Sequence, residues 1–172
     1  MFILWGVLSL LPVAKPITAP INPPAIQAQQ VKHINPAIEM MGKLVGGTWR
    51  NTGPFVIEFT YEWRVKGQAI RGIGVMGKGD PMETPSESLY GWDAEKKKVY
   101  YLDFHGANTV YSGLCGVKDG KFQGDFMGLI GDKGHYRFET QMPDNDTYTA
   151  SVFAMKDNKW VELHTMTFKR HR

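Results

Sequence analysis

Three histidines, His105, His135 and His164, lie where strands are predicted, and each could act as a metal ligand or as an acid or base. No two of them have the i, i+2 or i, i+4 spacing of a metal-binding pair. Isolated strand histidines usually satisfy hydrogen bonds in the core or on the surface. We therefore predict no metal site from them and keep all three as candidate ligand-pocket residues.

Tyr101, Asp103 and His105 alternate along one predicted strand, so their side chains share a face. An Asp–His pair could support a general base. However, no serine lies in a recognisable nucleophile elbow, and no cysteine lies beside this pair in sequence. The same residues could simply satisfy a strand end and its turn, which is the interpretation we favour. No catalytic residue is assigned.

His135, Arg137 and Glu139 alternate with Tyr136 and Phe138. If the polar set faces inward, it lines a cavity in which Arg137 could hold a carboxylate. If it faces outward, it forms a solvated strand surface, and the need to bury the two aromatic rings favours this arrangement. His135 and Arg137 are kept among the pocket candidates because the sequence leaves both arrangements open.

Aromatic side chains are more numerous than a minimal barrel core requires. Ligand pockets are mostly apolar with a few placed polar groups, so some of these rings could line a cavity. They could equally fill the interior, because an eight-stranded barrel can be closed solid by side chains. The pocket candidates are Tyr61, Trp63, Tyr90, Trp92, Tyr101, His105, Tyr111, His135, Arg137 and His164.

A short helix is predicted before the strands. Asn35 suits its N-cap and Pro36 its first position, apolar residues at 38, 41 and 45 fall on one face, and Gly46 ends it. From residue 55 the apolar period changes to two, which is typical of half-buried strands. Strands are predicted over 55–65, 69–76, 87–92, 98–104, 109–117, 121–130, 135–142, 147–155 and 159–169, with a longer polar loop over 78–86.

With a segment at Trp49, this gives about nine or ten short strands joined mostly by tight turns. No helix of crossover length is predicted between them, which excludes parallel βαβ units. The fold class is therefore all-β. A single antiparallel up-and-down barrel with a short N-terminal helix fits best because closure removes exposed strand edges, and a two-sheet sandwich is the structural alternative.

The N-terminal region is predicted to be separate from the barrel. Residues 2–11 form an apolar run of signal-peptide length, too short for the roughly 20 residues that span a bilayer. We expect a signal peptide and linker over 1–30, a linker and the short helix over 31–45, and the barrel over 46–172. This favours export to the periplasm or the exterior, although no Lys or Arg precedes Lys15 and a cytoplasmic location stays open.

Composition narrows the classes of partner. The chain of 172 residues has a net charge of +3, from 20 basic and 17 acidic residues, and no long basic block, so we predict no nucleic-acid partner. Cys115 is the single cysteine of the sequence, which excludes a disulfide within the chain and a cysteine-based zinc or iron–sulfur site.

Gly47-Thr48-Trp49, directly after the short helix, resembles the Gly-x-Trp opening of lipocalins and fatty-acid-binding proteins. The resemblance implies that the tryptophan packs across the barrel floor and that a basic residue near the end of the last strand lies over it. Arg170 is the candidate, with Lys169 second. A guanidinium over an indole contributes roughly 0.5–2 kcal/mol.

From Met41 to Arg170 the chain is more specifically similar to the bacterial family catalogued as domain of unknown function 1579. The similarity rests on the segments 44–49, Gly91-Trp92-Asp93 and Phe168-Lys169-Arg170. It implies a lipocalin-like, calycin-type barrel with no established reaction.

Nitrobindin-type haem barrels are a second resemblance. They share Gly-Thr-Trp near the start and have a haem-ligating histidine shortly before a final arginine, and here His164 precedes Arg170 by six residues. The resemblance implies haem as a cofactor through His164. The chain departs from that family after Trp49, where residues 50–54 replace a Gly-rich, Tyr-Pro-containing stretch.

These observations lead us to expect an exported, non-catalytic barrel that binds a small, mostly apolar ligand. One alternative is a haem-binding barrel, or an enzyme in which Asp103, His105 or His135 acts as acid or base. The other is a solid structural or protein-interaction module, which a contiguous exposed aromatic patch would mark.

Overall fold

The computed structural model describes residues 35–52, 55–77, 83–106 and 108–171. The predicted signal peptide and linker over 1–30, and the start of the linker that follows, lie outside the described residues.

Helix α1, Pro36–Gly42, precedes the strands. The Asn35 side chain accepts a hydrogen bond from the Ala37 amide at 2.8 Å, which satisfies one of the open donors of the first turn. The helix ends at Gly42 rather than continuing to Gly46, and tighter turns follow over 43–45. A Cβ at position 42 would lie 2.7 Å from the Trp63 ring, so the glycine lets this ring pack against the end of the helix.

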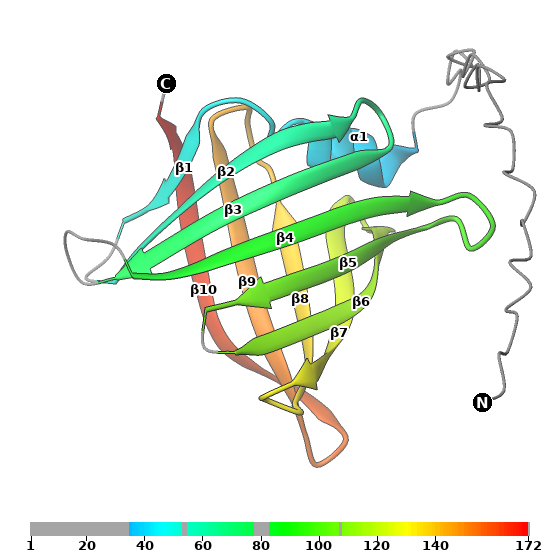
Figure 1. Cartoon of the computed structure of the whole chain (residues 1–172), viewed down its shortest axis with the longest axis vertical. Helices are drawn as coiled ribbons and strands as arrows, with labels where there is room; N and C mark the ends of the chain where they lie inside the picture. The colour runs from blue at the N-terminus through cyan, green and yellow to red at the C-terminus, as the bar shows by residue number, and fades with distance from the viewer. Residues whose placement is uncertain (1–34, 53–54, 78–82, 107, 172) are drawn as a thin grey trace, which may run out of the picture. The chain divides into compact units, whose positions relative to one another are not determined.

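Ten strands within the described residues form one closed antiparallel barrel (Figure 1). They are β1 (Thr48–Asn51), β2 (Val56–Val65), β3 (Ala69–Gly77), β4 (Glu83–Asp93), β5 (Lys98–His105), β6 (Thr109–Lys118), β7 (Lys121–Ile130), β8 (His135–Gln141), β9 (Thr147–Lys156) and β10 (Lys159–His171). From β2 to β10 each strand pairs with the next in sequence, and β1 closes the barrel between β2 and β10. The predicted single all-β barrel is confirmed.

Strand β4 is longer than predicted, because it begins at Glu83 inside the expected loop over 78–86. Its pairing with β3 is irregular between Gly74 and Met76, and its pairing with β5 begins only at Ser86. Pro85 therefore lies in a part of the strand where a missing backbone donor disturbs the ladder little. The extension places Ser86 inside the barrel, where it is buried.

At β-bulges the regular alternation of inward and outward side chains is interrupted. Ile57, Phe59 and Trp63 point into the barrel as the period of two predicts, and Ile57 is buried. A register shift after Trp63 leaves Val65 exposed. A second register shift, between β6 and β7, leaves Ile130 exposed, although simple alternation along β7 would place Ile130 on the inward face.

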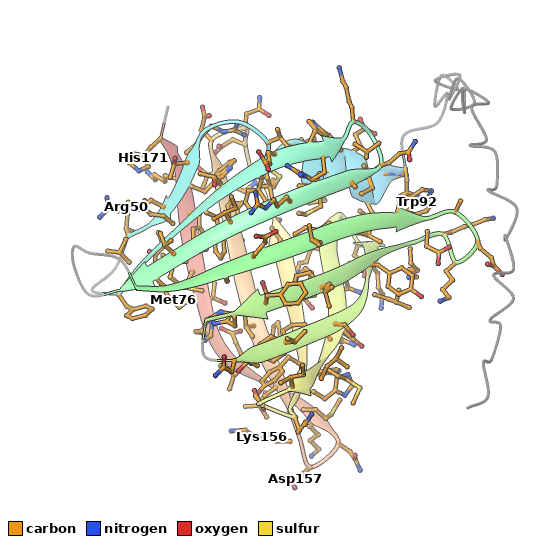
Figure 2. The ribbon with its side chains drawn as sticks, in the orientation of Figure 1. Arg50, Met76, Trp92, Lys156, Asp157 and His171 are labelled. Carbon is orange, nitrogen blue, oxygen red and sulfur yellow. The ribbon has the colours of Figure 1, made fainter. Side chains whose placement is uncertain are left out.

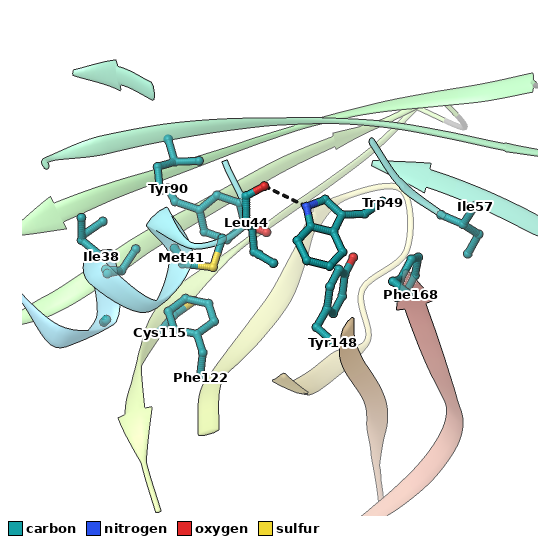
Figure 3. Packing of buried hydrophobic residues seen from close by; sticks show 13 residues of the cluster. Ile38, Met41, Leu44, Trp49, Ile57, Tyr90, Cys115, Phe122, Tyr148 and Phe168 are labelled. Carbon is teal, nitrogen blue, oxygen red and sulfur yellow. Dashed lines mark hydrogen bonds between the residues drawn. The ribbon is translucent and has the colours of Figure 1, made fainter. Parts of the chain in front are cut away.

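The core is concentrated at the end of the barrel that α1 covers. Trp49 is fully buried there, and its Nε1 donates to the Leu44 carbonyl at 2.8 Å (Figure 3). The Tyr148 ring meets the indole edge-on, with 4.9 Å between centroids, and Met41 of the helix faces Phe122 and Cys115 in the same cluster. This end is the closed floor of the barrel.

The opposite end has no such cover among the described residues. Lys156 and Asp157 mark the tip of the β9–β10 hairpin there, far from α1 (Figure 2). The ends of β5 and β7 and the starts of β6 and β8 also meet at this end, so residues near them surround the mouth of the barrel.

Candidate functional site

The barrel interior holds an aromatic chamber of about 170 Å³. Its floor is formed by Met41 of helix α1 and by Leu44 just after the helix, and its walls come from seven strands. The wall residues are Phe59, Tyr61, Tyr90, Tyr101, Phe122, Phe126, Phe138, Thr140, Tyr148, Ala150, Val152, Met166 and Phe168. The interior is therefore not filled solid.

The chamber is electrically neutral because its tyrosines keep their protons. Burial raises the pKa of Tyr61 to about 12, and burial also raises the pKa of Tyr90, Tyr101 and Tyr148 well above the ordinary value. The hydroxyl groups of Tyr61 and Tyr148 are hydrogen-bonded to each other. These groups need no charged partner, so the chamber suits an uncharged, mostly apolar guest.

A second cavity, of about 300 Å³, lies at the mouth. It is lined by Tyr101, Asp103, His105, Tyr111, Phe126, Tyr136, Val152, Leu163 and His164. Tyr101, Phe126 and Val152 also line the chamber, so the two hollows adjoin. The interior thus changes from apolar at the floor to partly polar at the mouth.

Asp103 is the acidic group of the mouth, with only 5% of its surface exposed. Its Oδ1 accepts a hydrogen bond from Ser88 Oγ at 2.6 Å, and Ser88 is also bonded to Tyr101. Burial raises the pKa of Asp103, while the Ser88 hydrogen bond and the neighbouring His105 act in the opposite direction. The mouth therefore contains a carboxyl group that is poorly solvated and sensitive to any new charge placed beside it.

Two tyrosines of the mouth are held by a carboxylate at its rim. Asp132, in the β7–β8 turn, accepts hydrogen bonds from the hydroxyl groups of Tyr111 and Tyr136 and from the Gly134 amide. These bonds lower the pKa of Asp132. Because both hydroxyl groups are engaged at the rim, the rings of Tyr111 and Tyr136 are fixed as walls, with 5.9 Å between their centroids.

Phe126 separates the chamber from the mouth, and a glycine makes room for it. Gly113 is its direct partner across the β6–β7 ladder, and a Cβ there would lie 2.8 Å from Phe126 Cβ and 2.0 Å from the Asp125 carbonyl. The Phe126 ring contacts the rings of Tyr101 and Tyr136, at centroid distances of 5.7 and 5.4 Å. The position of this aromatic partition thus depends on the absence of a side chain at 113.

The structure brings together six of the residues singled out in the sequence. Tyr61, Tyr90 and Tyr101 line the chamber, and His105, Tyr111 and His164 line the mouth. Trp63 and Trp92 pack against the core cluster instead, outside the residues that line either hollow.

His135 and Arg137 lie on the outer face, in the arrangement that the sequence favoured, and line neither of the two inner hollows. Arg137 forms a two-fold ion pair with Asp125, at 2.6 and 3.0 Å, and its guanidinium lies 4.4 Å from the Trp160 ring centroid. The His135 ring also contacts Trp160, at 5.0 Å. The outward arrangement follows from Tyr136, which occupies the inward position between them.

His135 and Arg137 line an outer groove of about 690 Å³, together with exposed aliphatic residues such as Leu114 and Met127. The groove is larger than either inner hollow, but its lysines and Asp125 are exposed, and the half-buried Arg137 is paired with Asp125. It offers no buried polar group to orient a ligand. We therefore place the candidate site inside the barrel.

Sequence reasoning missed Ser88, Phe126, Tyr136 and Asp132 as site residues. Ser88 could have been found, because it lies within the strand predicted over 87–92 and shares the inward face with Tyr90. Asp132 gave no signal, because a turn aspartate looks the same whether or not tyrosines from two strands reach it.

The described residues contain no group of three or more His, Cys, Asp or Glu side chains arranged to hold a metal ion. None of their helices has the length and apolar character needed to cross a membrane.

A closed antiparallel barrel with a floor tryptophan and an internal cavity defines a barrel of the lipocalin-like type in general. No protein-family profile matches the sequence, and no curated protein matches it either.

Proposed function

We propose that this protein binds one small, mostly apolar molecule inside the barrel, with an aromatic or similarly flat end in the chamber and a polar end at the mouth. The observation that supports it is that the aromatic chamber and the polar mouth adjoin, sharing Tyr101, Phe126 and Val152 as lining residues. A solid barrel would need no such hollow, and a purely structural core would not place Asp103 beside it.

The chamber sets the size of the apolar end. An apolar protein cavity of about 150 Å³ accommodates a benzene molecule, and this chamber measures about 170 Å³. One aromatic ring therefore fits, and a fused polycyclic system does not. The ligand enters at the mouth, where Leu163 is 44% exposed, because α1 covers the other end.

The binding experiment uses toluene as a neutral one-ring probe, titrated into the protein and followed by NMR shifts of the chamber residues. Saturable one-to-one binding is expected. Ala150→Leu places extra methyl groups in the chamber, so this variant is expected to lose toluene binding while remaining folded.

Thr149→Leu is the matched control. Position 149 precedes Ala150 on β9 and points to the opposite face, so the same side chain is added outside the chamber. Toluene binding by this variant should equal that of the original protein. Absence of saturable binding, or equal binding by Ala150→Leu, would overturn the proposed function.

Haem, which the nitrobindin resemblance implies, fits the interior poorly. His164 does line the mouth. However, a haem has roughly forty non-hydrogen atoms, and at the roughly 25 Å³ per atom of a benzene-filled cavity it needs about 1,000 Å³. The mouth measures about 300 Å³ and the chamber about 170 Å³. We derive no step through haem; a Soret shift abolished by His164→Ala would reverse this assessment.

Two further parts of the proposal rest on the sequence. The apolar run over residues 2–11 supports export of the binding barrel. The ordered motifs between Met41 and Arg170 support membership of the domain of unknown function 1579 family, which implies the fold and no reaction. Acid–base catalysis by Asp103 and His105 would add chemistry to the same cavity, and turnover of a bound ligand that Asp103→Asn abolishes would reveal it.

A further inference from the structure

We propose that the natural ligand is an arylalkylamine, whose ring occupies the chamber and whose ammonium group binds Asp103 between the aromatic rings of the mouth. This inference rests on the proposed function and names its ligand class. Neither the chamber nor Asp103 alone identifies this ligand class, because a ring-sized chamber accepts many molecules and a carboxyl group accepts many donors.

Asp103 is a buried carboxyl group with room for a further hydrogen-bond donor. Asp103 is 5% exposed and has the Ser88 hydroxyl at 2.6 Å from one of its oxygens. A carboxylate has two oxygens and about four acceptor positions, so one hydrogen bond leaves capacity for a ligand donor. A cationic donor would favour the ionised form and offset the cost of burying it.

Aromatic side chains surround the cavity that contains Asp103. Tyr101, Tyr111, Phe126 and Tyr136 line the mouth beside Asp103. Their neighbouring rings contact one another, with centroid distances of 5.4–5.9 Å. Asp132 fixes two of them from the rim. Aromatic walls attract ammonium groups through the negative faces of the rings, and several such walls form an aromatic cage.

The distance along β5 between Tyr101 and Asp103 limits the length of the ligand. Tyr101 lines both hollows, and Asp103 follows it by two positions on β5, on the same face. Two residues along a strand advance about 6.6–6.8 Å. A ring beside Tyr101 is therefore connected to an amine at Asp103 by a short alkyl spacer. Long-chain amines would extend past the carboxyl group into solvent.

The charges at the mouth favour a cation over an anion. None of the described residues that line it is Lys or Arg, so a carboxylate or phosphate ligand would lack a permanent positive partner. His105 and His164 are the titratable bases there, and the tyrosines Tyr101, Tyr111 and Tyr136 are neutral donors. At the rim, Asp132 is acidic, and Lys133 of the same turn donates to the Leu129 carbonyl.

The experiment compares three ligands of one shape by calorimetry at pH 7.5: 2-phenylethylamine, the neutral 2-phenylethanol and the anionic phenylacetate. The amine is expected to bind at least about tenfold more tightly than the alcohol, since a charged hydrogen bond contributes about 1.5–3 kcal/mol and about 1.4 kcal/mol is tenfold. Phenylacetate should bind most weakly.

Asp103→Asn keeps the shape of the side chain and removes its charge. It should weaken amine binding by about tenfold or more and leave alcohol binding nearly unchanged. Asp125→Asn removes the same charge on the outer face, where Asp125 pairs with Arg137, and should leave both affinities unchanged. This control separates a local contact from an effect of net charge.

The outcomes distinguish the two proposals. If the alcohol binds and the amine binds no better, or if Asp103→Asn does not reduce the amine preference, the amine inference is overturned and the binding barrel stands. If none of the three ligands binds the folded protein, and toluene does not bind either, the proposed function itself fails.

Discussion

Arg170 and Trp49 are direct partners across the β1–β10 ladder, and the Arg170 guanidinium carbon lies 4.3 Å from the centroid of the indole ring. The same guanidinium donates to the carbonyl of Gly46 at 2.6 Å and to that of Lys43. One side chain thus joins the first strand, the last strand and the segment after α1. This contact seals the floor of the barrel.

Arg170→Met should therefore destabilise the barrel by about 2–3 kcal/mol, because a cation–π contact contributes about 0.5–2 kcal/mol and a charged hydrogen bond about 1.5–3 kcal/mol. Urea unfolding measures the change. Arg50→Met is the control, because Arg50 on the same strand forms an exposed pair with Glu58 at 3.1 Å. Such pairs contribute about 0–1 kcal/mol. Equal losses in the two variants would show that Arg170 is an ordinary surface residue.

Asp103→Asn should make the ligand-free protein more stable at neutral pH. Burial raises the pKa of Asp103 above its ordinary 3.8, so the folded state holds this proton more strongly than the unfolded state does. The stability of the original protein should consequently fall as pH rises through the interval between the two pKa values, and Asn removes that fall. Thermal unfolding at pH 5 and pH 7.5 tests the sign. A lower melting temperature for Asp103→Asn at pH 7.5 would contradict it.

Amine binding should weaken as pH falls, whereas the stability of the ligand-free protein should increase. As pH falls, protonation of Asp103 removes the charge that holds the ammonium group. Because the pKa of Asp103 is raised, the loss begins above the range of an exposed aspartate. The affinity of 2-phenylethylamine should fall on acidification while that of 2-phenylethanol stays constant. A parallel change in both would indicate unfolding instead.

Gly113→Ala should destabilise the barrel and disturb the partition between chamber and mouth. The new methyl group would lie 2.0 Å from the Asp125 carbonyl and 2.7 Å from Phe126 Cα, so backbone must move. Overpacking of this kind costs about 1–3 kcal/mol. Gly91→Ala is the control, because nothing lies within 4 Å of its added Cβ. That change should be neutral or stabilising by up to about 1 kcal/mol. Equal effects in urea unfolding would refute the steric explanation.

The Cys115 thiol should be unreactive in the folded protein. Burial raises its pKa to about 12, and the side chain is 1% exposed. Ellman's reagent at pH 8 should modify it only after unfolding in urea, because the thiolate is the reactive form. The control combines Cys115→Ala with Leu114→Cys, which moves the thiol to an exposed neighbouring position. Rapid labelling of native Cys115 would show that the α1 end opens readily.

Much of the fold could be predicted from local pattern. The period of two located the strands, and Gly-x-Trp together with a terminal Arg predicted the contact between Trp49 and Arg170 across the closed barrel. Where prediction departed from structure, the cause was a contact from another element. The Trp63 ring packs against Gly42, where α1 ends, and the irregular pairing with β3 accompanies the start of β4 before Pro85.

The candidate site was predictable only in part. Alternation placed Tyr101, Asp103 and His105 on one face, and it favoured the outward position of His135 and Arg137 that the structure shows. The sequence could not show that Ser88 meets Asp103 or that Asp132 holds Tyr111 as well as Tyr136. Ser88 and Asp103 are 15 residues apart and Tyr111 and Asp132 are 21 residues apart, so each pair meets only through strand register.

The sequence by itself therefore determined an all-β barrel and the faces of most strands, because these depend on periodicity and on neighbours along the chain. Its resemblance to lipocalins implied the floor pair of Trp49 and Arg170. Only the tertiary structure decided that the barrel is hollow and that its polar groups gather at one end. The empty volume is a small difference between the space enclosed by ten strands and the side chains that fill it. That difference depends on how rings such as Phe126 pack against glycines on neighbouring strands, and the local sequence pattern does not predict this packing.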